Sequence, residues 1–258
     1  MKRHSWDANG GISRRWGSGA TAWLGNILLC DDDDLDYQAS RTRFTPGTGF
    51  TLDEAYRLAH LPLVAPRHPK VIVAKPGTAY ERGRHGKVLS IVLPVPDVDH
   101  LLEPELKAAP FAAKIAWNIA ERRRGRLHAT LCGSPPDIDR VALTTIGPIT
   151  VEVRGLFSGN INHGRLYLRV YPEKRDGENQ LKRVQRLVGG RETGLYLVGL
   201  HNFTDDLDAN EAAALAALIE RWWDRPILRW QVDALWLLAA WDDLVLDGGI
   251  EETISLAP

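Results

Sequence analysis

Apolar and polar positions follow a regular rhythm from about residue 87 to the end of the chain. Short runs rich in leucine, β-branched and aromatic residues predict strands at 87–95, 125–133, 149–159, 164–172, 194–203 and 229–241. Runs with apolar residues at helical spacing predict helices at 103–122, 134–146, 178–190 and 208–224. Pro110 falls inside the first of these helices or at a break in it.

The predicted order is strand, helix, strand, helix, hairpin, helix, strand, helix, strand. This order favours an α+β protein with mostly antiparallel pairing, and it contains an approximate internal repeat. Local signals agree with it, because Gly159 and Gly164 flank the hairpin turn and Asp208 or Asn210 can cap the last helix.

Residues 1–85 have a different character. The first part is rich in glycine and serine, residues 31–36 form an acidic block that reads as a flexible tail, and prolines interrupt 61–77. Thr51 and Glu54 predict a capping box before a helix, and 70–75 predict one strand. We therefore expect 1–85 to be a loosely structured extension that packs on a main domain at 86–258.

Composition and charge exclude several classes. The net charge of −1 argues against a globally basic nucleic-acid-binding protein, so any basic surface must be local. Two cysteines form neither a disulfide framework nor a metal-binding spacing. The longest apolar run, 234–241, is much shorter than a membrane span, and the N-terminus has no secretory signal. We expect a cytoplasmic protein with no membrane partner.

The strand at 125–133 carries the most informative chemistry. Because side chains alternate along a strand, Arg126, His128, Thr130 and Cys132 are predicted to share one face. An imidazole can exchange a proton near neutral pH, while a hydroxyl and a guanidinium can hold a phosphoryl oxygen. This row therefore predicts a phosphate site.

A second histidine strand, 194–203, occupies the equivalent place in the other half of the repeat and carries His201. From Lys87 to Pro258 the chain resembles the 2H phosphoesterases, the family of 2′-5′ RNA ligases and RNA cyclic phosphodiesterases, whose two His-x-Thr/Ser motifs face each other across a cleft. His128-Ala129-Thr130 matches the first motif, and His201 matches the second histidine. The resemblance implies a duplicated strand–helix unit whose two mostly antiparallel sheets form a central cleft, with helices outside.

The second motif departs from the family pattern. Thr204 stands three residues after His201, where the family has a hydroxyl two residues after, so Phe203 shares the histidine's face on a regular strand. A bulge could turn Thr204 inward. Otherwise the second arm lacks its hydroxyl.

The resemblance implies a hydrolase that needs no metal or other cofactor. Its substrate would be an RNA 2′,3′-cyclic phosphate end, a 2′-5′ phosphodiester or a small nucleotide with a cyclic phosphate. His128 and His201 would exchange protons, while Thr130 and Thr204 would hold the phosphoryl oxygens. The residues expected to contact substrate are Arg126, Tyr167 and Arg169.

Two other functions remain open at this point. One is a catalytically degenerate module of the same fold that binds RNA or a nucleotide without turnover. The other is a scaffold in which the N-terminal extension covers the cleft and exposed surfaces bind a protein. His163, in the hairpin turn, is an alternative second histidine.

Overall fold

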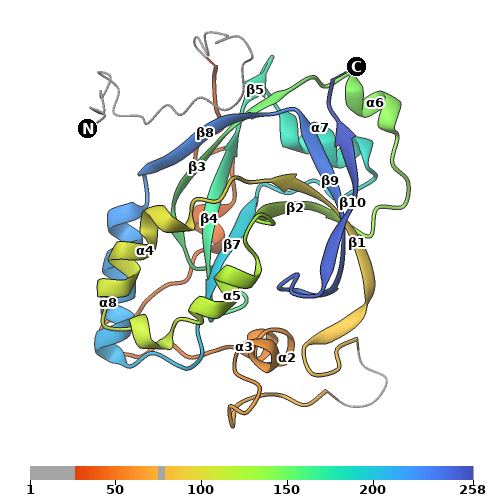
Figure 1. The fold of residues 1–258 in the computed structure, drawn as a ribbon. Coiled ribbons are helices and arrows are strands. Elements are labelled where there is room, and N and C mark those ends of the chain that lie inside the picture. The colour runs from red at the N-terminus through yellow and green to blue at the C-terminus, as the bar shows by residue number, and fades with distance from the viewer. Residues whose placement is uncertain (1–26, 75–78, 258) are drawn as a thin grey trace, which may run out of the picture.

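The main sheet contains eight strands that pair antiparallel throughout. A computed structural model describes residues 27–74 and 79–257, and the extension before residue 27 lies outside them. The order across the sheet is β10-β9-β1-β2-β7-β4-β3-β8 (Figure 1). The bounds are β1 Arg84–Pro94, β2 His128–Gly133, β3 Ile149–Phe157, β4 Arg165–Pro172, β7 Leu197–Asn202, β8 Pro226–Val232, β9 Ala234–Asp242 and β10 Gly248–Ser255. A separate small hairpin joins β5 (Lys174–Arg175) and β6 (Glu178–Asn179).

The two histidine strands, β2 and β7, are neighbours at the centre of this sheet. They are joined through one residue pair, Ala129 and Val198, whereas every other neighbouring pair in the sheet has five or more paired residues. Two separate sheets were expected, but the hydrogen bonding links all eight strands into one. The α+β class and the antiparallel pairing are confirmed.

The helices after residue 98 follow the predicted order with shorter extents. They are α4 (Asp99–Ala108), the 3₁₀ turn η1 (Ala112–Lys114), α5 (Trp117–Arg122), α6 (Arg140–Thr144), α7 (Gln180–Leu187) and α8 (Ala209–Trp222). Pro110 lies in the break between α4 and η1, because proline cannot donate the hydrogen bond that would continue the helix. The sequence predicted Asp208 or Asn210 as the cap of α8, and it is Asp208 that caps the helix, in a capping box with Glu211.

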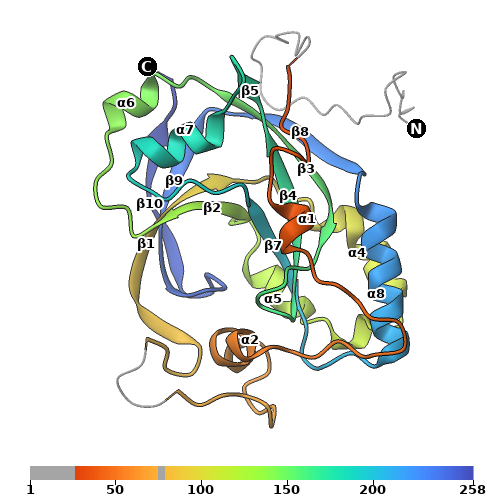
Figure 2. The same ribbon diagram turned by 180° about the vertical axis from the view of Figure 1, so that it is seen from behind.

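The C-terminal region is richer in strands than the sequence predicted. One strand was expected at 229–241, whereas the structure has three strands, β8, β9 and β10, between Pro226 and Ser255. A break at Asp233 separates β8 from β9, which lie at opposite ends of the strand order. The β9–β10 hairpin extends toward α2 and α3 (Figures 1 and 2).

The described part of the N-terminal extension is closely packed on the sheet. It forms α1 (Tyr37–Ser40), α2 (Glu54–Ala59) and α3 (Leu61–Val64), and Tyr37, Tyr56 and Leu61 are completely buried. Asp53, not Thr51, caps α2. Residues 70–74 form no strand, although their composition predicted one. Within 27–74 the extension is therefore part of the core, and it is not loose.

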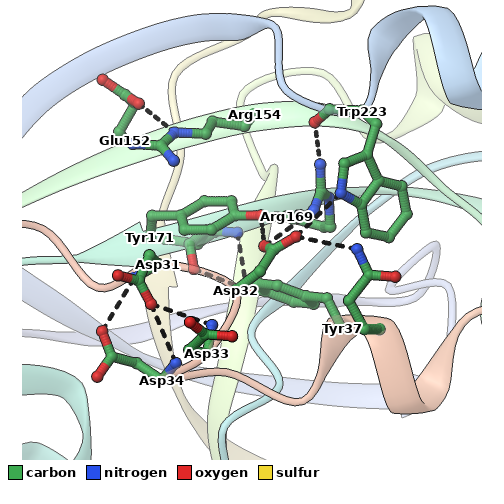
Figure 3. A network of polar contacts seen from close by, with 12 residues as sticks. Asp31, Asp32, Asp33, Asp34, Tyr37, Glu152, Arg154, Arg169, Tyr171 and Trp223 are labelled. Carbon is green, nitrogen blue, oxygen red and sulfur yellow. Dashed lines mark hydrogen bonds and ion pairs between the residues drawn. The ribbon is translucent and has the colours of Figure 1, made fainter.

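The acidic block holds a buried arginine and is not a flexible tail. Asp32 accepts hydrogen bonds from the Tyr171 hydroxyl and the Trp223 indole nitrogen, and it forms an ion pair of 3.4 Å with Arg169 (Figure 3). The Arg169 guanidinium stacks on the Trp223 ring, 3.7 Å from its centroid. Asp34 pairs with Lys174 at 2.6 Å. These contacts join the acidic block to β4, to β5 and to the C-terminal end of α8.

Candidate functional site

His128 stands at the first position of β2, next to Pro94 of β1. Its Nδ1 lies 2.7 Å from the carbonyl oxygen of Arg126. A carbonyl can only accept, so Nδ1 of the neutral ring carries the hydrogen and Nε2 keeps its lone pair. Burial is the main cause that lowers the pKa of His128 to about 4. The hydrogen bond to the Arg126 carbonyl acts in the opposite direction, and the positive charges of Arg165, Arg123 and Arg126 contribute to the lowering. The imidazole is therefore a neutral proton acceptor at pH 7.

Thr130 is exposed and lies on the same face as His128, as predicted. Cys132 does not share this face. Ile91 pairs with Cys132 and Val92 pairs with Thr130, so Leu131 is an extra residue in β2. The Cys132 thiol packs in the core, with Gly190 so close that a Cβ there would lie 2.9 Å from Sγ.

A second bulge, in β7, decides where His201 points. Tyr167 pairs with Gly199 and Leu166 pairs with His201, which leaves Leu200 as the extra residue. Paired residues share a face and successive residues of β4 alternate, so His201 lies on the face of Leu166. Gly199 lies on the face of Tyr167.

The pairing of Ala129 with Val198 carries this register to β2. Val198 also pairs with Leu168, so Ala129 lies on the Leu166 face and His128 lies on the other. We call the face that carries His128, Gly199 and Tyr167 the His128 face. The register thus places the two histidines on opposite faces of the sheet, and their expected meeting across one cleft is not found.

The surroundings of His201 agree with this placement. Its ring packs edge-on against Trp117 of α5, with centroids 5.1 Å apart. Its side chain is 2% exposed, and neither ring nitrogen has a hydrogen-bond partner in the described part of the structure. Burial lowers its pKa to about 4, helped by Arg123 and opposed by Glu103. The charge of Arg165 contributes to the lowered pKa of His128 but not to that of His201.

The second motif has no hydroxyl beside its histidine. The Thr204 hydroxyl donates to the carbonyl oxygen of Lys114 at 3.1 Å, and the Thr204 amide donates to the same oxygen. Phe203 is buried against Phe111. The bulge that could have turned Thr204 inward is instead at Leu200, where it turns His201.

Arg165 shares the His128 face with Tyr167 by alternation along β4, and it was not among the residues predicted from the sequence. Its guanidinium lies directly over Gly199, where any side chain would collide with it. Its Nε has no hydrogen-bond partner within the described residues, and its Nη1 donates to the carbonyl oxygen of Asp243 at 3.3 Å. The sequence carried a signal, because Arg165 alternates with Tyr167 and Arg169 along one strand.

The three residues expected to contact substrate have different environments. Tyr167 lies on the His128 face but is only 8% exposed, with the Arg165 guanidinium 5.3 Å from its ring. Arg169 shares that face, yet it is fully buried in the Asp32 network and cannot reach a ligand. Arg126 donates to the carbonyl oxygens of Arg122 and Gly248, at 2.6 and 3.1 Å.

The N-terminal extension and the β9–β10 turn cover part of the His128 face. Asp243 of that turn is the shared contact, with its carboxylate 2.6 Å from the Tyr80 hydroxyl, 3.2 Å from His85 Nε2 and 3.7 Å from His60 Nε2. His60 is 1% exposed, and its Nδ1 has no partner among the described residues. Burial holds the pKa of His60 well below its usual range, with added repulsion from Arg165 and Arg123. No feature of the sequence pointed to this histidine.

A pocket of about 400 Å³ adjoins the same face. Among its lining residues, Pro94 pairs with His128, and Trp236 pairs with Val92, which also pairs with Thr130. Trp230 lines the pocket as well. The pocket thus has two tryptophans in its lining and includes Pro94, the strand partner of His128.

Within residues 27–74 and 79–257, no cluster of three or more His, Cys, Asp or Glu side chains is arranged to hold a metal ion. No helix of the same residues is long and apolar enough to cross a membrane. Comparison of the chain with models of protein families and with curated proteins finds no match.

Proposed function

We propose that the protein binds the phosphate group of a nucleotide or of an RNA end on the His128 face. The observation that carries this proposal is the Arg165 guanidinium held over Gly199, beside the neutral imidazole of His128. Within the described residues this half-buried guanidinium donates one hydrogen bond, to a carbonyl, so it keeps donors for an anion. Thr130 is exposed on the same face and can add a hydroxyl donor.

The aromatic pocket supports a nucleotide over inorganic phosphate. A base can stack on an indole ring, and such stacking contributes about 1–3 kcal/mol per base. Trp236 lies on the His128 face by register, two strands away from Thr130.

The experiment is a titration of the full chain with a 2′,3′-cyclic nucleotide and with the same nucleoside lacking phosphate. We expect binding of the first that falls at least tenfold for Arg165→Gln, because a charge-assisted hydrogen bond contributes about 1.5–3 kcal/mol. Arg186→Gln is the matched control, since Arg186 of α7 pairs with Glu178 and Glu192 and does not lie on the His128 face. Equal binding of both ligands, or an unchanged Arg165→Gln, would refute the phosphate site.

In this proposal the fold is 2H phosphoesterase-like and retains one of the family's two His-x-Thr/Ser motifs, His128-Ala129-Thr130. Four strands lie on each side of the β2–β7 junction, and the histidine strands are the central pair, which is the arrangement a duplicated unit favours. The second arm differs because His201 lies on the other face and Thr204 bonds to Lys114. These two differences favour a binding module over the two-histidine enzyme.

The second candidate is the phosphodiesterase that acts with His128 and His201 on RNA 2′,3′-cyclic phosphate ends or 2′-5′ linkages. It is favoured by the position of both histidines beside the β2–β7 junction, where Arg123 affects both. It needs β7 to lose its bulge so that His201 reaches the His128 face. Turnover that is lost in His201→Gln as well as in His128→Gln would support it over the binding module.

A further inference from the structure

Asp243, in the β9–β10 turn, contacts the extension, the start of β1 and the cation of the proposed phosphate site. Its two carboxylate oxygens lie 2.6 Å from the Tyr80 hydroxyl and 3.2 Å from Nε2 of His85. The carbonyl oxygen of the same residue accepts from Nη1 of Arg165 at 3.3 Å. One residue therefore links an imidazole, which can change its charge, to the guanidinium proposed to hold a phosphate.

His85 makes a different contact with Asp243 in each of its two charge states. Its Nδ1 lies 2.6 Å from the carbonyl oxygen of Gly86, so this nitrogen carries a hydrogen. In the neutral ring Nε2 then has only a lone pair, and this nitrogen lies 3.2 Å from a carboxylate oxygen. The imidazolium has a hydrogen on both nitrogens and forms an ion pair with Asp243. Protonation of His85 therefore changes the net charge of the pair.

We propose that His85 regulates the phosphate site: its protonation neutralises Asp243 and strengthens anion binding at Arg165, and its deprotonation weakens that binding. The inference rests on the proposed function, since it concerns a phosphate held by Arg165. It assigns to the chain a regulatory residue that acts on the site through charge, without contacting the ligand, and it makes binding depend on pH.

The physical cause is the charge next to Arg165. When His85 is neutral, the carboxylate of Asp243 attracts the guanidinium and repels an approaching anion. When His85 is protonated, the pair has no net charge, so the positive charge of Arg165 is available to the anion. The side chains of His85 and Asp243 are 12% and 35% exposed, so salt screens the pair incompletely. Arg84 pairs with Asp247 at 3.1 Å, so the neighbouring charges on β1 and on the turn balance each other.

The other ionisable groups that face the Asp243 carboxylate keep their charge near neutral pH. Burial and the hydrogen bond to Asp243 raise the pKa of Tyr80, whose ring also packs edge-on against His85, so its hydroxyl stays protonated. His60 lies 3.7 Å from the carboxylate and stays neutral, because burial holds its pKa well below the usual range. In the part of the chain that the structure describes, His85 is therefore the contact of Asp243 whose charge can change.

The test is a calorimetric titration of the full chain with 2′,3′-cyclic AMP at about pH 5.5, 7 and 8.5 and constant ionic strength. The phosphodiester keeps one negative charge over this range, and His128 stays neutral because burial lowers its pKa to about 4. We expect the dissociation constant of the wild type to rise about fivefold or more from the lowest to the highest pH, the lower range for coupling between two sites. Binding should also take up protons, because anion binding and protonation of His85 favour each other.

Two variants should remove the pH dependence and leave opposite affinities. His85→Gln has no ionisable ring, so at every pH it should bind within about twofold of the wild type at about pH 8.5. Asp243→Asn lacks the carboxylate that competes for Arg165, so at about pH 8.5 it should bind as tightly as the wild type does at about pH 5.5. His68→Gln is the matched control. His68 also lies in the extension and faces a carboxylate, Asp205, at 3.2 Å, so this variant should keep the pH dependence.

The remaining outcomes separate this inference from the proposed function. Binding that needs Arg165 but is equal at every pH would overturn the regulation and leave the phosphate site intact. A pH dependence that persists in either His85→Gln or Asp243→Asn would assign it to another group and would also overturn the inference, so each variant is a test even if the other does not fold. Absence of binding at every pH would end both proposals.

Discussion

The guanidinium of Arg165 lies over Gly199, in the space that a side chain at position 199 would fill. Gly199 neighbours β2 on one side and β4 on the other, so this contact brings a cation of β4 next to His128. The absence of a side chain at this strand position therefore leaves room for the Arg165 guanidinium on the His128 face.

Gly199→Ala should displace Arg165 and weaken binding of 2′,3′-cyclic nucleotides at least tenfold. The added methyl group occupies the place of the guanidinium, and a charged hydrogen bond to the ligand is lost. Calorimetric titration measures the change. Gly249→Ala is the control and should bind normally, because a methyl group added at this strand glycine would meet no atom within 4 Å. Normal binding by Gly199→Ala would show that Arg165 does not contact the ligand.

Asp32→Asn should lower the free energy of unfolding by roughly 2–4 kcal/mol. Removing one partner of a buried ion pair leaves the other charge uncompensated, and Arg169 is fully buried. Asp33→Asn is the control in the same acidic block, where an exposed side chain predicts a change below about 0.5 kcal/mol. Urea unfolding of both variants measures the difference, and equal stability would contradict a structural role for Asp32.

Trp236→Ala should weaken the binding of nucleotides while leaving that of inorganic phosphate unchanged. The loss of a stacking surface costs about 1–3 kcal/mol per base, which is roughly 5- to 150-fold in the dissociation constant. Trp241→Ala removes an exposed tryptophan from the same strand and outside the pocket, so it should have no effect. A parallel loss of phosphate binding in Trp236→Ala would show that the pocket is not a base site.

Stability should fall as the pH drops from about 6.5 toward 4, and His201 should account for part of the fall. Its pKa is about 4 in the folded chain, against an ordinary value of 6.5, so in this range the unfolded chain binds a proton that the folded chain does not. A shift of this size corresponds to about 3 kcal/mol at pH 4 and below.

His201→Leu tests this dependence. The variant has no imidazole to protonate, so the difference in unfolding free energy between pH 7 and pH 4.5 should shrink. It also removes two buried nitrogens that have no partner in the described structure, so stability at pH 7 should change little. An unchanged pH dependence would mean that His201 titrates normally in the folded protein.

The local pattern of the chain determined the order and the type of most elements after residue 86. Periodicity acts within a few positions, so the strands around His128 and His201 could be predicted from the sequence. For Pro110 and for the cap of α8 the sequence left two alternatives each, and the structure has the break at Pro110 and the cap at Asp208. The same reasoning placed Tyr167 and Arg169 on one face of β4, because alternation along a strand is local.

Tertiary structure decided which of these side chains form a site. The bulge at Leu200 exists only in the pairing of β7 with β4, and one extra residue moves His201 to the opposite face. Asp32, in a segment that precedes the main sheet in the chain, holds Arg169 in a buried ion pair and so keeps it from the surface of the His128 face. Alternation fixes a face only relative to near neighbours, whereas register and burial depend on partners far away in the sequence, and these set the chemistry of the His128 face.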